Sequence, residues 1–486
     1  MHVPIVPTPL PVRGGTQSVQ ISIASSGIGG SNGHCVIEAP PRRSPGDSSR
    51  PCTIGPVLLT VGALSPKSTT SLCTSFDALL KRYPTQASSL SVLLGRRSRQ
   101  MTWRSFTVLD TGADTKVEFT TPVLVPRSSP IIGFVFSGQG PQHINSASVI
   151  PEETQLLNFS LVGRQLFRDF PVFRNSILAM DMIYTRTTGR SLLSSTGLFD
   201  MQQTETSLPE IWPISIILPS IAIIQIALVD LLRSWGIVPD VVVGHSAGET
   251  AMLYACGSVT KEVAVEIAIA RGQALQKTES SETTMAAISC DAAAVSIIIS
   301  EVRARLANGV LEIACYNDDY AVTVAGNTTL INNLVDECKS RGISAQRLRT
   351  NVAVHSSIMD LCKSELRSQI QGIFDRHGVT SNSAPKIPAY SCATSNRIDG
   401  TLDADYIWRN TRQPVLFGDC VKNVVKAYSD KRLTFVEIGP HPVLSGYLSS
   451  LLPENSTILS PMRRTKSPSY HHERTIILRA AGGLAC

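Results

Sequence analysis

After residue 130, short apolar runs alternate with longer stretches in which apolar residues recur at helical spacing. Apolar runs without polar alternation are typical of strands that are buried on both faces of a parallel sheet. The pattern therefore predicts an α/β core, with a parallel sheet and helices on both of its faces. The strands that it predicts most clearly are 131–137, 240–244, 386–391 and 434–439.

A second unit is predicted inside this core, at about residues 284–350. Its order of strand, helix, strand, strand, helix and strand is that of a ferredoxin-like βαββαβ unit. The insertion would divide the surrounding core into residues 131–283 and 351–465, and a cleft between two subdomains is a common place for a ligand. The six predicted elements are 284–289, 292–307, 311–317, 321–326, 329–342 and 345–349.

The first 130 residues have a weaker pattern. Residues 1–40 end in a glycine-rich turn followed by a short apolar strand, and 41–51 is a linker rich in Pro, Ser and Arg. A small α/β segment follows to about residue 130. It contains no motif that carries chemistry, so we interpret it as a spacer domain. Its predicted elements are a strand at 56–64, a helix at 69–83 and a strand at 103–110.

Composition places the chain among ordinary globular proteins. The 486 residues suffice for two to four domains, and 43% are hydrophobic and 17% charged. The net charge of +6 is spread along the chain without a basic run, so no nucleic-acid partner is predicted. Eleven cysteines occur without a CxxC pair, which favours reduced thiols in a cytoplasmic protein over a disulfide framework or a metal site.

No membrane segment is predicted. The N-terminus lacks the charged and apolar regions of a signal peptide. Residues 213–236 are long and apolar enough to span a bilayer, but they contain Pro219, Gln225 and Asp230. We therefore predict a buried core helix here rather than a membrane span.

The candidate chemistry begins at residues 244–248, which read Gly-His-Ser-Ala-Gly at the end of an apolar strand. A tight strand-to-helix turn would expose the Ser246 hydroxyl as a nucleophile, with glycines where a Cβ would clash. An ordinary glycine-rich turn is the alternative, because this short motif is weak when it stands alone.

A serine nucleophile needs a base, because its hydroxyl is almost never ionised near neutral pH. His355 follows an apolar, strand-like stretch directly after the inserted unit, which would place it at the mouth of the cleft. His441 lies in a proline-flanked turn that favours a structural role, and His245 adjoins Ser246 but points elsewhere on a sharp turn. The glycines of 136–140 (FSGQG) would let backbone N–H groups approach a ligand, as an oxyanion hole requires.

Together these motifs identify a family. The chain contains, in this order, the motifs FSGQG, GHSAGE, ARG, VAVHS and EIGPHPVLSG. They resemble the acyltransferase domain of polyketide and fatty acid synthases over about residues 131–465. The fungal iterative polyketide synthases are the most similar. GIGGSNGHCVIE resembles the end of a ketosynthase domain, so 1–40 would be a ketosynthase remnant, 41–130 the ketosynthase-to-acyltransferase linker, and 466–486 the post-acyltransferase linker. The resemblance implies an α/β-hydrolase-like core with a ferredoxin-like insert.

By this resemblance, Ser246 accepts an acyl group from a coenzyme A thioester, and His355 is the general base. A backbone carbonyl rather than an Asp would orient the histidine. The N–H groups of Gln139 and Ala247 would form the oxyanion hole. No bound cofactor or metal is implied, because coenzyme A enters as the thioester substrate and phosphopantetheine is carried by the partner acyl carrier protein.

The resemblance also implies three substrate-binding residues, Arg271, His245 and Val354. Arg271 taken alone would be a solvated helix arginine, but in the family it grips the carboxylate of a malonyl group, which a guanidinium matches bidentately. Malonyl is favoured as the extender unit. Methylmalonyl stays open, because Val354 stands where many malonyl-specific members have a larger phenylalanine and one methyl group is worth only about 1–3 kcal/mol.

The chain departs from the family in two respects. About fifteen residues are inserted after the GQG motif, and 143–161 is either a surface loop or an artefact of the gene model; Val162 stands where methionine is usual. Motifs of a ketosynthase active site, a carrier protein and a reductase are missing. We therefore expect a fragment of a multidomain synthase, which acts in trans on a carrier protein beside other synthase domains. A serine hydrolase or thioesterase and a catalytically disabled fragment are the alternatives.

Overall fold

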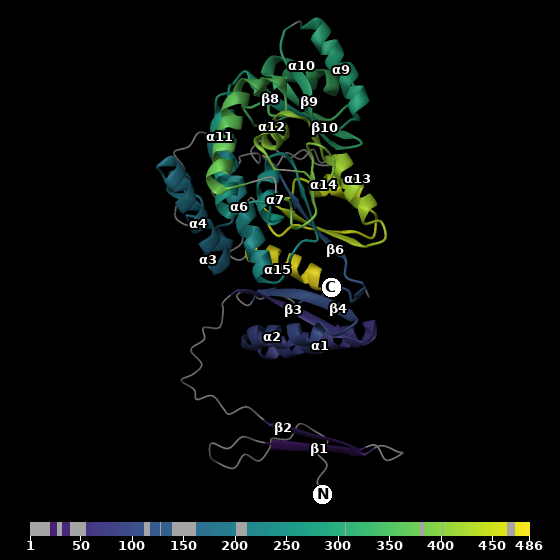
Figure 1. Cartoon of the computed structure of the whole chain (residues 1–486). Helices are drawn as coiled ribbons and strands as arrows, with labels where there is room; N and C mark the ends of the chain where they lie inside the picture. Colours follow the sequence, from purple (N-terminus) through teal and green to yellow (C-terminus); the bar gives the residue numbers. More distant parts are fainter. Residues whose placement is uncertain are drawn as a thin grey trace. The chain divides into compact units, whose positions relative to one another are not determined.

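The computed structural model divides the chain into two compact units, Met1–Ile54 and Gly55–Cys486 (Figure 1). In the first unit, strands β1 (Gln20–Ser26) and β2 (Asn32–Glu38) pair antiparallel. Gln139 and the inserted segment 143–161 lie outside the described residues. The residues that the structure describes are 20–26, 32–38, 55–110, 117–126, 128–138, 162–200, 211–306, 308–379, 383–400, 402–463 and 472–486.

The second unit begins with a three-stranded antiparallel sheet of β3 (Pro56–Ala63), β4 (Trp103–Asp110) and β5 (Val123–Leu124). Helices α1 (Pro66–Arg82) and α2 (Ala87–Ser98) pack on it, and in Figure 1 they lie on one side while the last helix lies on the other. The predicted strands and helix are present here. Helix α2 was not predicted, because so few of its residues are buried that its sequence has little apolar periodicity.

The main core is a parallel sheet with the order β12-β7-β6-β14-β15. The four strands predicted for it are confirmed, and most of their residues are buried, which explains why the sequence there lacks polar alternation. The strands are β6 (Ile131–Phe136), β7 (Val241–Gly244), β12 (Ala389–Ser391), β14 (Leu433–Ile438) and β15 (Thr457–Leu459).

Helices from the segments outside the insert surround this sheet, and the predicted α/β class is confirmed. Two clusters of buried side chains join the sheet to the helices packed against it; one includes Phe134, Phe136 and Val242, and the other includes Val135, Val241 and Val243. The helices are α3 (Arg164–Asp169), α4 (Pro171–Thr188), α5 (Leu192–Thr196), α6 (Ile214–Ser234), α7 (Glu249–Ala255), α8 (Lys261–Gln276), α11 (Lys363–His377), α12 (Ala404–Arg412), α13 (Phe417–Ala427) and α14 (Ser445–Leu451).

Helix α6 is the apolar segment that is long enough to span a membrane but that we predict to be a buried core helix. Among the described residues it alone has the length and composition to cross a membrane, and 83% of its most apolar window is buried inside the protein. Its polar Gln225 donates hydrogen bonds to the carbonyls of Ser137 (2.7 Å) and Ile438 (3.0 Å) at the strand ends. The prediction of a core helix is confirmed, because protein surrounds this helix and supplies two acceptors for the amide nitrogen of Gln225.

The inserted unit has the predicted βαββαβ order and an antiparallel sheet in the order β11-β8-β10-β9. A two-residue strand from outside the insert, β13 (Val415–Leu416), adds to β9 in parallel. So short a run gives no signal in sequence. The elements of the insert are β8 (Thr283–Ile288), α9 (Ala292–Arg305), β9 (Leu311–Asp318), β10 (Ala321–Asn327), α10 (Thr328–Ser340) and β11 (Ala345–Arg347).

The C-terminal segment forms a helix, α15 (His472–Ala485), that packs against β3, β4 and α3. Its Glu473 is buried, and the carboxylate accepts hydrogen bonds from the backbone N–H groups of Gly163 (2.5 Å) and Gln165 (2.8 Å) at the start of α3. Negative charge is favourable at a helix N-terminus. This contact joins the C-terminal helix to helix α3 of the main core across more than 300 residues.

Replacing this carboxylate gives a first test of the fold. We expect Glu473→Ala to lower the free energy of unfolding by about 3 kcal/mol, because it leaves buried N–H groups without an acceptor. The apparent melting temperature should fall by several degrees in a thermal scan. Glu454→Ala, at an exposed glutamate, is the control. Equal melting temperatures for the two variants would show that the contact contributes nothing.

Candidate active site

The backbone around Ser246 is strained in the way that a nucleophile turn requires. Ser246 lies at φ +54°, a left-handed conformation that is costly for a residue with a side chain. A Cβ on Gly248 would lie 2.3 Å from the Phe136 carbonyl oxygen, and one on Gly244 would lie 2.6 Å from Glu249 Cγ. Both positions therefore require glycine. The strand-to-helix turn that the sequence predicts is present.

His355 lies directly against the serine. Its Nε2 is 2.7 Å from Ser246 Oγ, and its Nδ1 is 2.8 Å from the backbone carbonyl oxygen of Gln413. A carbonyl can only accept, so Nδ1 carries the proton and Nε2 accepts the hydrogen bond from the serine hydroxyl. The structure therefore brings together two residues that are 109 positions apart, and it supplies the orienting carbonyl that the sequence could not locate.

The segment before His355 is not the strand that its apolar residues suggest. Residues 352–355 form an irregular turn, and His355 itself has φ +62°. The run Val352-Ala353-Val354 is apolar because all three residues are buried in the core, which an irregular segment can achieve as well as a strand. That expectation was wrong, although His355 does lie in the wall of the cleft.

The surroundings of His355 keep its imidazole neutral. Burial lowers the pKa of His355 to about 3; the Gln413 carbonyl opposes this shift, and the nearby Arg271 and His245 add to it. A neutral imidazole has a free lone pair on Nε2. His355 can therefore take a proton from Ser246 over the whole physiological range of pH.

The Ser246–His355 pair opens into a cavity of about 100 Å³ between the core and the inserted unit. Both subdomains line it, as the predicted cleft requires. The core contributes Gly138, Ile217, His245, Ser246, Val354, His355, Val443, Leu444 and Tyr447, and the insert with the segment after it contributes Met285, Ala287, Cys315, Asn317, Thr323, Leu348, Arg349 and Thr350.

His245 points away from the serine, toward the insert. Its Nε2 is 3.0 Å from Asn317 Oδ1, and Asn317 Nδ2 donates to Thr323 Oγ1 (3.2 Å). Because the amide nitrogen is the donor to Thr323, Oδ1 accepts from the histidine N–H. Burial lowers the pKa of His245, so its imidazole is neutral. The side chain connects the nucleophile turn to Asn317 in the lining of the cavity.

Arg271 is buried on α8, so the alternative of a solvated helix arginine is wrong. Its Nη1 donates to Thr250 Oγ1 at 3.3 Å, and its Nε has no hydrogen-bond partner among the described residues. Burial lowers the pKa of Arg271 to about 10, and the charge of Glu249 opposes the shift. The guanidinium does not line the cavity that the described residues form. Arg271 is nevertheless a buried cation, next to Thr250 of the helix that follows the nucleophile turn, and its Nε–H has no acceptor among the described residues.

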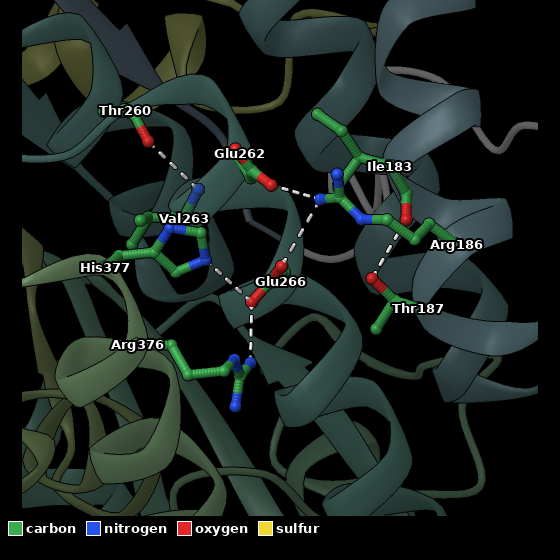
Figure 2. A network of polar contacts seen from close by, with 9 residues as sticks. All are labelled: Ile183, Arg186, Thr187, Thr260, Glu262, Val263, Glu266, Arg376 and His377. Atoms are coloured by element: carbon green, nitrogen blue, oxygen red, sulfur yellow. Dashed lines mark hydrogen bonds and ion pairs between the residues drawn. The ribbon is translucent and has the colours of Figure 1, made fainter.

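Helix α8 is held in place by a network of charges at its N-terminal end (Figure 2). Arg186 of α4 pairs with Glu262 and Glu266, and Arg376 of α11 donates to Glu266 at 2.8 Å. His377 Nε2 lies 3.2 Å from Glu266 as well. Two carboxylates and a histidine could in principle hold a metal ion. Here two arginines bind the carboxylates, so the arrangement favours an ion-pair network that fixes α8 between α4 and α11.

Of the two residues that are predicted to form the oxyanion hole, the structure describes Ala247 but not Gln139. Ala247 follows Ser246 in the first turn of the helix, where N–H groups have no intrahelical partner. Gln139 lies outside the described residues, and its role stays a prediction. Gly138 precedes it and lines the cavity, and a Cβ there would lie 2.9 Å from the His245 carbonyl oxygen. Val162, the departure from the family pattern, is buried in the core.

Sequence reasoning missed Gln413, because a backbone carbonyl leaves no side-chain signature. One signal was present. Pro414 follows it, and the residue before a proline is disfavoured in the α conformation. Gln413 is accordingly extended, with φ −73° and ψ 153°, and ends α12. A helix that stops at this point releases a carbonyl that can face His355.

The family follows from sequence comparison. The family model "Acyl transferase domain" matches residues 160–480, about two thirds of the chain, and "Ketoacyl-synthetase C-terminal extension" matches residues 1–108. The chain belongs to the acyl transferase domain family, as the resemblance predicted. The domain boundaries drawn from the sequence stay predictions.

The individual relatives are polyketide synthases. The chain is 39% identical over 466 residues to the highly reducing polyketide synthase stpks1 of Strobilurus tenacellus, covering 96% of this chain and 16% of the relative. It is 30% identical to the highly reducing polyketide synthase ZEA2 of Gibberella zeae, covering 93% and 19%. The chain thus spans less than a fifth of the length of these relatives.

Solved structures agree on the fold. The acyl transferase domain of ZmaA has a TM-score of 0.71 at 20% identity, covering 89% of this chain and 95% of that one. The acyltransferase domain from module 8 of the salinomycin polyketide synthase has a TM-score of 0.69 at 20% identity, covering 88% and 96%. The predicted fold class is confirmed.

The pKa of His355 predicts an unusual pH profile. The rate at which phenylmethanesulfonyl fluoride modifies Ser246 should be nearly the same at pH 5 and pH 7.5, because the base stays neutral. A histidine with an ordinary pKa of 6.5 would retain only about 3% of its neutral form at pH 5. Mass spectrometry measures the labelling, with Ser246→Ala as the control and circular dichroism to verify folding. A midpoint near 6.5 would contradict the burial argument.

Proposed function

We propose that the chain transfers a malonyl extender unit from malonyl-CoA, through an acyl ester on Ser246, to the phosphopantetheine thiol of an acyl carrier protein. The observation that carries the proposal is the hydrogen-bonded chain from Ser246 Oγ through His355 to the Gln413 carbonyl, at the wall of a cavity. A serine next to a correctly oriented neutral base is what nucleophilic acyl transfer requires.

In the first half-reaction, Ser246 Oγ attacks the thioester carbonyl while its proton moves to His355 Nε2. The oxyanion that forms would be bound by the N–H groups of Ala247 and Gln139, and each such donor is typically worth about 3 kcal/mol in the barrier. Collapse of the intermediate breaks the carbon–sulfur bond. Coenzyme A leaves as the thiol after taking the proton from His355.

The second half-reaction runs in the reverse sense. The carrier thiol gives its proton to His355 and attacks the acyl ester, and Ser246 Oγ leaves with that proton. The Gln413 carbonyl holds the imidazole in one tautomer throughout and stabilises the transient imidazolium. The position of the ester in the cleft between the two subdomains would limit the competing attack by water.

Malonyl specificity rests on two residues. Arg271 would bind the free carboxylate, because it is a buried cation whose Nε has no partner among the described residues. Val354 lines the cavity next to the base and would contact the α-carbon of the acyl group. We favour malonyl over methylmalonyl as the extender unit.

The proposed partners are a carrier protein acting in trans and the other domains of a polyketide synthase. We place the protein in the cytoplasm, where a reducing environment suits the ten cysteines in the described part of the chain, all of which are free thiols. Steady hydrolysis of the acyl-Ser246 ester in the absence of a carrier would instead support the alternative of a hydrolase or thioesterase. A folded protein that is never acylated would support the disabled fragment.

The nucleophile is tested by intact-protein mass spectrometry after brief incubation with malonyl-CoA. We expect a malonyl adduct on the wild-type chain and none on Ser246→Ala, because among the described residues that line the cavity only the Ser246 hydroxyl is hydrogen-bonded to a neutral histidine. An adduct that persists on Ser246→Ala would show that the nucleophile is misassigned.

The carboxylate clamp is tested by Arg271→Ala with malonyl-CoA and acetyl-CoA side by side. Loss of a charge-assisted contact of about 1.5–3 kcal/mol should lower kcat/KM for malonyl loading by about 10- to 150-fold. Acetyl loading should change far less, since acetyl has no carboxylate. Arg303→Ala, at an exposed arginine of the insert, is the control. Equal losses for both substrates would exclude the clamp.

A further inference from the structure

Glu249 is a buried carboxylate for which the proposed mechanism has no use. It is the first residue of α7, directly after the nucleophile turn, and its side chain is 1% exposed. Burying a carboxylate is costly unless hydrogen bonds or charges compensate. Three hydrogen-bond donors reach this one, and none of them comes from Ser246 or His355.

The first two donors lie at the end of β12. Ser391 Oγ donates to Glu249 Oε1 (2.9 Å) and lies 3.1 Å from Oε2, and the backbone N–H of Cys392 donates to Oε1 (2.8 Å). Ser391 is also the register partner of Gly244 in the sheet. Glu249 therefore joins the carboxyl ends of two neighbouring strands.

The third donor lies on another element. The hydroxyl of Tyr406, in the first turn of α12, donates to Glu249 Oε2. Asp403 caps this turn by accepting from the Tyr406 N–H (2.6 Å). At the opposite end of the helix, the Gln413 N–H donates to the Arg409 carbonyl (2.8 Å). A single short helix thus connects the residue that Glu249 binds to the residue whose carbonyl orients His355.

The segment after Gln413 is tied to the same carboxylate. The Leu416 N–H donates to the Cys392 carbonyl at 2.7 Å, and the N–H of Cys392 donates to Glu249. Gln413 therefore lies between two attachments, Tyr406 before it and Leu416 after it, that both lead back to Glu249. The carbonyl of Gln413 cannot shift without disturbing at least one of them.

We propose that Glu249 is a positioning residue: by tying α12 and β12 to the nucleophile turn, it fixes the Gln413 carbonyl and, through it, the ring of His355 against Ser246. The inference deepens the proposed function and rests on it for turnover. The geometry on which the inference rests involves the Ser246–His355 pair and not the substrate. Glu249 also faces Arg271 as a counter-charge. A substitution at Tyr406 separates the two roles, because it cuts the tie to α12 and leaves the Glu249 carboxyl group itself in place beside Arg271.

The test compares Tyr406→Phe with Tyr254→Phe. Tyr254 is a matched control, because its hydroxyl also donates to a carboxylate, that of Asp230, away from the catalytic pair. Two rates are measured for each variant: turnover with malonyl-CoA and a carrier protein, and modification of Ser246 by phenylmethanesulfonyl fluoride. In the second reaction the serine oxygen bonds to sulfur, fluoride leaves, and His355 takes the proton, so no acyl substrate is needed.

For Tyr406→Phe we expect both kcat and the rate of sulfonyl fluoride labelling to fall by about 10-fold or more, because small misplacements of catalytic groups cost up to about 100-fold. KM for malonyl-CoA should stay within about two-fold, since substrate contacts are unchanged. Tyr254→Phe should leave both rates within about two-fold of wild type. Glu249→Gln, which keeps the side-chain volume but replaces one acceptor oxygen, should act in the same direction and serves if Tyr406→Phe fails to fold.

Equal labelling rates for Tyr406→Phe and Tyr254→Phe would overturn the inference, and so would a wild-type Ser246 that the sulfonyl fluoride does not label. A wild-type chain that is labelled by the sulfonyl fluoride but never by malonyl-CoA would refute the proposed function alone. The comparison of labelling rates would then still decide the role of Glu249.

Discussion

The hydrogen bond of 2.7 Å between Ser246 and His355 is the contact on which the site depends, and the chain is strained at both of its ends to make it. Ser246 and His355 both have positive φ, at 54° and 62°, and each such residue costs of order 1–3 kcal/mol. Strain of this kind persists only where the surroundings fix the backbone. Here Gly244 and Gly248 admit the turn at the serine, and buried valines anchor the segment that carries the histidine.

Burial of polar groups is the second constraint. The site holds several ionisable side chains away from water, and each of them is compensated in a different way. His355 stays neutral, Arg271 faces the charge of Glu249, and Glu249 is surrounded by hydrogen-bond donors. Low local polarity strengthens every one of these interactions and makes an unpaired group expensive. The same burial lowers the pKa of His355, so its imidazole is neutral and Nε2 keeps a lone pair that can accept a proton.

Away from the cavity, charged contacts hold the supporting helices. The arginines of α4 and α11 clamp the acidic end of α8, and the C-terminal helix places a buried glutamate on the first turn of α3. These contacts join segments that are far apart in sequence. They lie within the compact unit Gly55–Cys486, in which the inserted subdomain and the parallel-sheet core both line one cavity.

Sequence alone was sufficient for the elements whose residues signal their own environment. Fully buried strands are apolar throughout. The strands and helices of the βαββαβ unit have distinct hydrophobic periods that can be recognised in sequence. The glycines around Ser246 are required by close contacts within the turn itself. The turn, the two main sheets and the acyl transferase family were therefore predictable. Helix α2 was not, because few of its residues are buried.

Tertiary structure decided the rest. The apolar segment before His355 is equally compatible with a strand and with a buried turn, and only packing chose the turn. The carbonyl of Gln413 and the donors around Glu249 are brought to the site by segments more than 50 residues from their partners, so no local pattern encodes them. A sequence records which side chains can react, but the distances between them exist only once the chain has folded.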